Sequence, residues 1–293
     1  MKAFVFPGQG SQFPGMGYDL YKSNEKVKSL FNEADDVLGF ALSNVMFNGN
    51  EEELKQTKIT QPAIFLHSIA KLSVLQETHS PSAVAGHSLG EFSSLVANNT
   101  ISFEDGLKLV FLRSKAMQKS CESSNGIMAA ILGLDDKTIK ETCESFDGNV
   151  TAANFNCPGQ VVISGELNAV KKICEKFNEI GARRSILLPV GGAFHSNLMN
   201  DAKSELKEAI HKTKFNNPTC PIYQNFTAQK TTSIDIIKEN LINQLTAPVL
   251  WTQTINNMVN DGYLDYTEVG PGKVLQGLIR KINREAITQS ALS

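Results

Sequence analysis

The sequence contains little of what would set it apart from ordinary globular proteins. Neither sign of charge dominates, because 28 Lys and Arg stand against 30 Asp and Glu, for a formal net charge of -2. No basic run offers a surface for a polyanion, so a nucleic acid partner is not expected. No apolar segment approaches the length of a membrane span, so no membrane association is expected. Hydrophobic residues still make up 41% of the 293 residues, enough to bury a sizeable core.

Cysteine is also scarce, and its positions exclude the usual cysteine motifs. No C-x-x-C pair and no metal-site spacing occurs among the five cysteines, which are Cys121, Cys143, Cys157, Cys174 and Cys220. Their odd number and wide scatter favour a reducing compartment. The apolar run near the N-terminus stops after four residues at Pro7, which is too short for a signal peptide. We therefore expect a cytoplasmic protein, or the mature form of an organellar one.

Strand and helix signals alternate along the first third of the chain. Residues 3–6 are an apolar run stopped by Pro7 and Gly8, which predicts a buried strand leading into a glycine-rich loop. Pro62 fits the first turn of a helix, and apolar residues continue from it at helical spacing to about residue 75. Residues 82–97 indicate a strand, a glycine-flanked turn and a helix.

The middle of the chain shows a different order of elements. Residues 126–190 predict a strand, a helix, two strands, a helix and a strand, which is the ferredoxin-like βαββαβ order. The flanking segments again alternate between helix and strand, with a helix at 200–213, a short strand near Ile222 and an amphipathic segment near Trp251. We therefore expect a ferredoxin-like subdomain of residues 125–190, inserted into a discontinuous α/β domain of residues 1–124 and 191–293.

Residues 86–90 fit the pattern G-x-S-x-G around Ser88. In such a turn the serine is exposed at the end of a strand, near the positive end of the following helix. The backbone N–H of Leu89 would then face a developing oxyanion. A plain strand-to-helix turn, with Ser88 as a cap, is the alternative. The strand and helix signals on the correct sides favour a nucleophile.

Two glycine-rich loops suggest nucleotide sites that the spacing does not support. Phe13 stands where the loop after the first strand would need its third dinucleotide-binding glycine. This loop can instead bring the backbone N–H of Gln9 against a reacting carbonyl oxygen, or it is only a tight turn. The loop before Lys273 lacks the first glycine of a phosphate-binding loop, so it predicts a turn that starts the last helix.

Five histidines are available as the base that a serine nucleophile needs. A structural or surface role is expected for His67, His79 and His211, which lie in predicted helices. His87 adjoins Ser88, but neighbouring side chains on such a turn point in different directions, so it is expected to line the pocket. His195 follows a predicted strand in a glycine-containing loop. It is either the base or a loop histidine with a structural partner.

Arg113 stands in an apolar position of the helix predicted after Ser102. The residues three and four positions before and after it are apolar, so the guanidinium projects from a helix face that should point inward. These residues are Leu109, Val110, Ala116 and Met117. A buried cation needs an anion. The partner is either a structural carboxylate or a substrate carboxylate held by two parallel hydrogen bonds.

The chain as a whole resembles the malonyl-CoA:acyl carrier protein transacylases, which are acyltransferases of fatty acid and polyketide synthesis. The resemblance rests on motifs that follow one another over nearly the whole chain: FPGQGSQ at 6–12, TQPAIF at 60–65, GHSLGEFSSLVA at 86–97, Arg113 with AMQ at 116–118, NFNCPGQVVISG at 154–165, GAFHS at 192–196, QLTAPVLW at 244–251 and EVGPGKVL at 268–275. It implies an α/β-hydrolase-like large domain with a parallel sheet core and the inserted ferredoxin-like subdomain.

The resemblance also assigns roles to particular residues. Ser88 is implied as the nucleophile, His195 as the base and Arg113 as the clamp for the malonyl carboxylate. The implied oxyanion hole is formed by the N–H groups of Gln9 and Leu89. Gln61 and Phe194 are implied as pocket residues. The backbone carbonyl of Leu250 is implied to orient the histidine, although many relatives carry a polar residue there.

The implied activity is transfer of malonyl from malonyl-CoA to the phosphopantetheine thiol of acyl carrier protein, through an ester on Ser88 and with ping-pong kinetics. No metal or redox cofactor is expected, and the enzyme is expected to be a monomer. One alternative is a stand-alone acyltransferase of a polyketide synthase, and another is an esterase or thioesterase. Arg113 argues against the latter. A non-catalytic carrier-binding protein would be expected to lack Ser88 or His195, and both are present.

Overall fold

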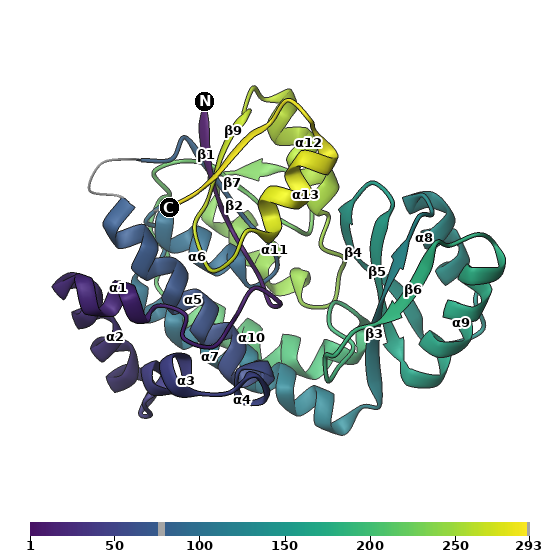
Figure 1. The fold of residues 1–293 in the computed structure, drawn as a ribbon, viewed down its shortest axis with the longest axis horizontal. Helices are drawn as coiled ribbons and strands as arrows, with labels where there is room; N and C mark the ends of the chain where they lie inside the picture. Colours follow the sequence, from purple (N-terminus) through teal and green to yellow (C-terminus); the bar gives the residue numbers. More distant parts are fainter. Residues whose placement is uncertain (76–79, 292–293) are drawn as a thin grey trace.

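A six-stranded sheet forms the centre of the larger part of the molecule (Figure 1). The computed structural model describes residues 1–75 and 80–291. Within them, neighbouring strands are parallel except for the last pair, in the order β10 (Ile287–Ser290), β9 (Asp265–Glu268), β1 (Lys2–Phe6), β2 (Ala83–Gly86), β7 (Ile222–Tyr223) and β8 (Lys230–Thr231).

The two faces of this sheet carry separate apolar cores. Along β1, Phe4 and Phe6 belong to one buried cluster, while Ala3 and Val5 belong to the other. Side chains alternate between the faces of a strand, so a strand covered on both sides reads as one continuous apolar run. Helices α5 (Thr57–Leu75), α6 (Gly90–Ala97) and α7 (Phe103–Ser123) cover the first face. Helices α12 (Trp251–Asn260) and α13 (Val274–Ile282) cover the second.

The remaining helices of this part pack against α5 and α7 directly or, for α1 and α11, through α2 and α10. They are α1 (Tyr18–Ser23), α2 (Glu25–Leu38), α3 (Leu42–Asn48), α4 (Glu51–Lys55), α10 (Asn200–Lys212) and α11 (Ile234–Gln244). Helix α5 begins at Thr57, earlier than the sequence predicted, so Pro62 lies inside it. Proline has no N–H for the carbonyl of Lys58, and Ser114 Oγ lies 3.5 Å from that carbonyl oxygen.

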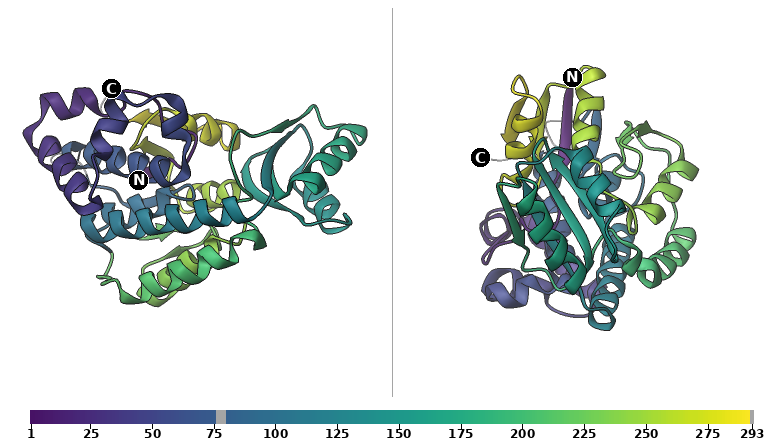
Figure 2. Two further views of the ribbon diagram at one scale, coloured as in Figure 1. Left: turned by 90° about the horizontal axis from the view of Figure 1, so that it is seen from below. Right: turned by 90° about the vertical axis from the view of Figure 1, so that its right-hand side faces the viewer.

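A separate antiparallel sheet follows α7 in the chain, in the order β4 (Val150–Cys157), β5 (Gln160–Glu166), β3 (Gly126–Leu132) and β6 (Arg184–Leu187). Helices α8 (Asp136–Glu144) and α9 (Leu167–Glu179) pack on its outer face, away from the large sheet (Figures 1 and 2). This is the ferredoxin-like order of elements. The predicted fold class is therefore confirmed.

The edge strand β4 joins the antiparallel sheet to the larger part. The backbone N–H of Phe155 donates to the carbonyl of Val249, and the N–H of Val249 donates to the carbonyl of Ala153. These bonds hold the antiparallel sheet beside the larger part, and a cavity lies between them. Among residues 1–75 and 80–291, no helix is long and apolar enough to cross a membrane.

Candidate active site

Ser88 occupies a strained turn between β2 and α6. Its φ of 51° lies in the left-handed region, which costs an L-residue on the order of 1–2 kcal/mol. The flanking glycines are required by contact, because a Cβ on Gly86 would lie 1.9 Å from the carbonyl carbon of Gly90. Asn225 holds the turn, since its Oδ1 accepts from the N–H of Ser88 at 2.6 Å and its Nδ2 donates to the carbonyl of Gly86 at 2.7 Å. The strand, turn and helix predicted around Ser88 are thus present.

Ser88 and His195 form a hydrogen-bonded pair. Ser88 Oγ lies 2.8 Å from Nε2 of His195, and Nδ1 of the same ring lies 2.9 Å from the backbone carbonyl oxygen of Gln244. Because a carbonyl can only accept, Nδ1 carries the proton and Nε2 is free to accept from the serine hydroxyl. Burial, with a further contribution from Arg113, lowers the pKa of His195 to about 3. The ring is therefore neutral at neutral pH, as a general base must be.

The carbonyl that orients His195 was predicted wrongly. Leu250 precedes α12, and its carbonyl accepts from the N–H of Thr254 in the first turn of that helix. Gln244 instead ends α11, where backbone carbonyls have no partner within the helix. The carbonyl of Gln244 accepts only a long hydrogen bond from the nearby backbone, from the N–H of Ala247 at 3.4 Å, and it accepts from His195 at 2.9 Å, six residues before the position implied by the resemblance.

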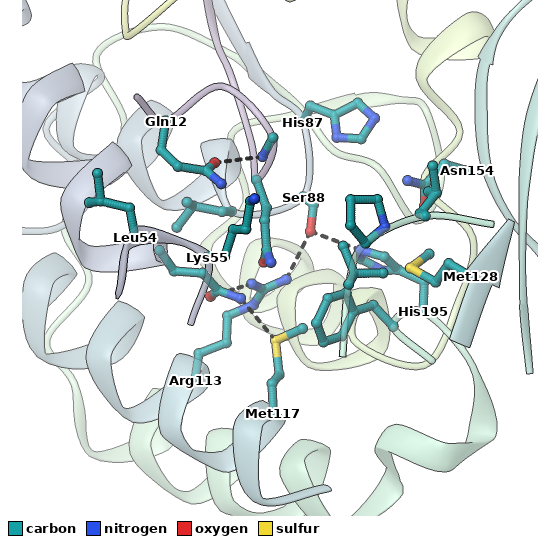
Figure 3. Close-up of a pocket in the computed structure, with 18 of the residues that line it drawn as sticks. Gln12, Leu54, Lys55, His87, Ser88, Arg113, Met117, Met128, Asn154 and His195 are labelled. Carbon is teal, nitrogen blue, oxygen red and sulfur yellow. Dashed lines mark hydrogen bonds between the residues drawn. The ribbon is translucent and has the colours of Figure 1, made fainter. Parts of the chain in front are cut away.

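Arg113 is fully buried and reaches the nucleophile (Figure 3). One terminal nitrogen donates to Gln61 Oε1 at 2.6 Å, and the other donates to Ser88 Oγ at 3.0 Å and Gln244 Oε1 at 3.1 Å. Burial lowers its pKa to about 10, and the charge of Glu91 acts in the opposite direction, so the guanidinium stays charged at neutral pH.

No carboxylate forms a salt bridge with Arg113 among the ion pairs of residues 1–75 and 80–291. Its Nε has no hydrogen-bond partner in the same part of the chain. The direct partners of the guanidinium are neutral side chains. Of the two alternatives drawn from the sequence, a structural carboxylate in direct contact is therefore absent from the described residues, and the site can accept an anion.

The predicted oxyanion-hole donors, Gln9 and Leu89, lie on the wall of the same cavity as Ser88. Within the described chain, no acceptor is recorded for the backbone N–H of either residue, so both can donate to a bound group. The loop of Gln9 lies directly on the turn of Ser88, since a Cβ on Gly8 would be 2.5 Å from the carbonyl oxygen of His87. This close approach explains the glycine before Gln9.

The cavity has a volume of about 450 Å³ and lies between the two sheets. The predicted pocket residues Gln61, His87 and Phe194 all line it. Nε2 of His87 lies 2.9 Å from Asn156 Oδ1, so this ring is held apart from the nucleophile. Burial lowers its pKa, and the hydrogen bond with Asn156 acts in the opposite direction.

Two further histidines within the described residues are not part of this pair. His67 is buried in α5, where burial lowers its pKa to about 3, and its Nδ1 has no partner among the described residues. His211 is exposed on α10, and His79 lies outside the described residues. A surface position is therefore confirmed for His211, while His67 is a core residue.

The sequence analysis missed three polar residues behind Ser88, namely Glu91, Asn225 and Gln244. Asn225 belongs to a segment far along the chain, and its spacing carries no signal. Gln244 opens the motif QLTAPVLW, but no role was assigned to it. Glu91 could have been found as Arg113 was, because it is the only charged residue in the helix GEFSSLVA.

Comparisons with known proteins agree on one family. The model of the acyl transferase domain matches residues 3–292, so the chain belongs to this family. The chain is 44% identical to the malonyl CoA-acyl carrier protein transacylase of Bacillus subtilis (strain 168), over 98% of its own length and 92% of that protein.

Solved structures give the same result. The acyl carrier protein S-malonyltransferase of Vibrio cholerae superimposes with a TM-score of 0.95 at 40% identity, covering 99% of this chain and 96% of that one. A malonyl-transacylase solved with its type II polyketide synthase acyl-carrier protein gives a TM-score of 0.95 at 39% identity, covering 99% and 95%.

Proposed function

We propose that this protein transfers a malonyl group from malonyl-CoA to the phosphopantetheine thiol of acyl carrier protein, through an ester on Ser88, and so supplies fatty acid synthesis. The observation that carries the proposal is the position of Arg113. A fully buried guanidinium with neutral partners lies 3.0 Å from the hydroxyl that would be acylated. Such a group is suited to a carboxylate attached to the transferred acyl chain. The names of the relatives from Bacillus subtilis and Vibrio cholerae support the same activity.

In the first half-reaction, Ser88 Oγ attacks the thioester carbonyl while Nε2 of His195 accepts the hydroxyl proton. The carbonyl oxygen becomes negatively charged, and the free N–H groups of Gln9 and Leu89 stabilise it. The intermediate then collapses, the carbon–sulfur bond breaks, and His195 returns the proton to the departing thiolate of coenzyme A. Arg113 pairs with the malonyl carboxylate during both steps.

The second half-reaction runs the same chemistry with another thiol. The phosphopantetheine thiol gives its proton to His195 and attacks the carbonyl carbon of malonyl-Ser88. The ester bond breaks, and the proton passes to Ser88 Oγ. Coenzyme A leaves before the carrier reacts, so the kinetics are ping-pong. Gln61, His87 and Phe194 line the space around the acyl group.

The proposed scheme assigns every proton and charge transfer to a protein group, so we propose that no metal or redox cofactor takes part. An esterase or thioesterase would pass the acyl group to water, and Arg113 gives no advantage to that reaction for uncharged acyl groups. A monomeric enzyme in a reducing compartment remains the prediction from the sequence.

The test is to observe both half-reactions separately. After brief exposure to malonyl-CoA, mass spectrometry of the intact protein should detect one malonyl group, and peptide mapping should locate it on Ser88. Adding holo acyl carrier protein should then move the label to the carrier faster than water releases it. Release mainly to water would reject the transferase and favour a thioesterase.

A further inference from the structure

Glu91 is a buried carboxylate for which the transfer mechanism above has no use. It lies in the first turn of α6, three residues after Ser88, and is fully buried. One carboxylate oxygen accepts from the backbone N–H of Asn225, and the other accepts from Nε2 of Gln244 at 2.6 Å. No ion pair among the described residues involves it. Burying a carboxylate without a direct cation is costly, so its presence calls for an explanation.

Gln244 connects this carboxylate to the site. Its Nε2 donates to Glu91 Oε2 and, at 2.9 Å, to the backbone carbonyl of Ser88, while its Oε1 accepts from Arg113 at 3.1 Å. The partners decide which way the amide faces, because carboxylate and carbonyl oxygens can only accept and a guanidinium can only donate. Glu91 thus orients the amide so that its oxygen faces Arg113.

This arrangement places a negative charge one amide away from Arg113. A carboxylate in direct contact would neutralise the guanidinium and compete with any anion brought by a substrate. Burial raises the pKa of Glu91 to about 8, whereas the hydrogen bonds from Asn225 and Gln244 and the charge of Arg113 act in the opposite direction. Both oxygens of Glu91 accept from N–H donors, an arrangement that favours the carboxylate. With Gln244 in between, this carboxylate stabilises the charge of Arg113. The guanidinium nevertheless keeps neutral partners and an unused N–H at Nε.

We propose that Glu91 is a positioning residue for acyl-group selectivity. Through the side-chain amide of Gln244 it holds Arg113 beside Ser88 and offsets the buried charge, while leaving the guanidinium available to the carboxylate of the acyl group. The inference rests on the proposed function, because it assumes that Arg113 binds that carboxylate.

The first test is Glu91→Gln. Its one amide oxygen replaces only one of the two carboxylate oxygens. The backbone N–H of Asn225 can only donate, so the amide oxygen faces it and the new NH₂ group faces Gln244. The amide of Gln244 then turns, and its NH₂ group meets the guanidinium of Arg113. We expect the ratio of kcat/KM for malonyl-CoA to that for acetyl-CoA to fall about tenfold, mainly through a higher KM for malonyl-CoA. The rate with acetyl-CoA should change much less.

The second test is Gln244→Glu, which places a carboxylate directly against Arg113. It also removes the donor to the carbonyl of Ser88, so both acyl groups should react more slowly. The malonyl-to-acetyl ratio should fall further than in Glu91→Gln, by about a hundredfold. Ser94→Ala is the matched control. Ser94 is buried on the same helix and its Oγ donates to the carbonyl of Gly90, away from Arg113 and Gln244, so the ratio should not move.

Circular dichroism and labelling of Ser88 by a fluorophosphonate establish that each variant is folded with a reactive serine. An unchanged malonyl-to-acetyl ratio in Glu91→Gln would overturn the inference. If both kcat/KM values fell by the same factor, Glu91 would only support the turn of Ser88. If Glu91→Gln does not fold, an unchanged ratio in Gln244→Glu decides against the inference. A ratio unaffected by Arg113→Ala would instead reject the carboxylate clamp of the proposed function.

Discussion

Replacing Arg113 with alanine removes the only charged side chain that contacts Ser88 Oγ among residues 1–75 and 80–291. A carboxylate held by a buried guanidinium through charge-assisted hydrogen bonds gains about 1.5–3 kcal/mol. This corresponds to a loss of roughly ten- to a hundredfold in kcat/KM for malonyl-CoA. Acetyl-CoA has no carboxylate, and in the variant its methyl group no longer meets a buried cation. We expect acetyl-CoA to react equally well or better.

The substitution also leaves two acceptors without their donor, Oε1 of Gln61 and Oε1 of Gln244. Each buried unsatisfied group costs about 1–3 kcal/mol of stability, so a lower unfolding temperature is expected. Arg113→Lys separates the effects, because lysine keeps the charge but cannot form two parallel hydrogen bonds. Its loss of malonyl-CoA activity should lie between those of wild type and Arg113→Ala.

The assay is kcat/KM for malonyl-CoA and acetyl-CoA in wild type and both variants, with the folded fraction measured in parallel. Equal proportional losses for the two thioesters would show that Arg113 only supports the fold. The carboxylate clamp would then have to be abandoned.

Four further predictions concern separate parts of the molecule. Ser88→Ala should abolish the malonyl adduct in intact-protein mass spectrometry, and an adduct on a cysteine would contradict the assignment. His195→Ala should slow both half-reactions in stopped-flow assays far more than His87→Ala, and the reverse order would reject His195 as the base. Methylmalonyl-CoA should be a poor substrate because Phe194 crowds an α-methyl branch, so Phe194→Ala should raise its kcat/KM relative to malonyl-CoA if the ring is the obstacle. Burial lowers the pKa of His67 from 6.5 to about 3. Between these pH values the unfolded chain binds more protons than the folded chain, so the free energy of unfolding should fall as pH falls, by about 1.4 kcal/mol per pH unit. His67→Leu should flatten that dependence in denaturant unfolding, and an unchanged slope would contradict it.

Local patterns predicted much of the fold. The elements of residues 126–187 and the strand, turn and helix around Ser88 follow from apolar periodicity and turn glycines, which depend on neighbouring residues alone. The sequence analysis assigned no element to residues 18–55, where the structure has α1 to α4. A signal existed there, since Asn24 caps α2 and its buried residues Val27, Phe31 and Ala34 recur at helical spacing.

The residues of the site also fall into those that a local pattern predicted and those that only the fold brings together. Ser88 and Arg113 were visible because each breaks a local rule, one by its glycine-flanked turn and the other by a charge on an apolar helix face. Asn225 contacts Ser88 across 137 positions of sequence, and only the folded chain brings them together. The wrong choice of Leu250 has another origin, because it was taken from the resemblance and not from a local pattern. The role fell on the wrong residue of the segment 244–251, and which carbonyl faces His195 depends on where α11 ends and α12 begins.

Arg113 also opposes the base that it accompanies. Burial is the largest cause that lowers the pKa of His195, and the positive charge of Arg113 is the second largest. The hydrogen bond from Arg113 also occupies a lone pair of Ser88 Oγ. A weaker base removes the serine proton less readily. A carboxylate bound to Arg113 offsets that charge, so binding of malonyl-CoA raises the basicity of His195, while acetyl-CoA leaves it low. Selectivity is then expressed in the acylation step as well as in binding, and we expect the single-turnover acylation rate at saturating thioester to favour malonyl-CoA in wild type. Arg113→Ala should remove that preference, because without the guanidinium neither acyl group changes the charge around His195.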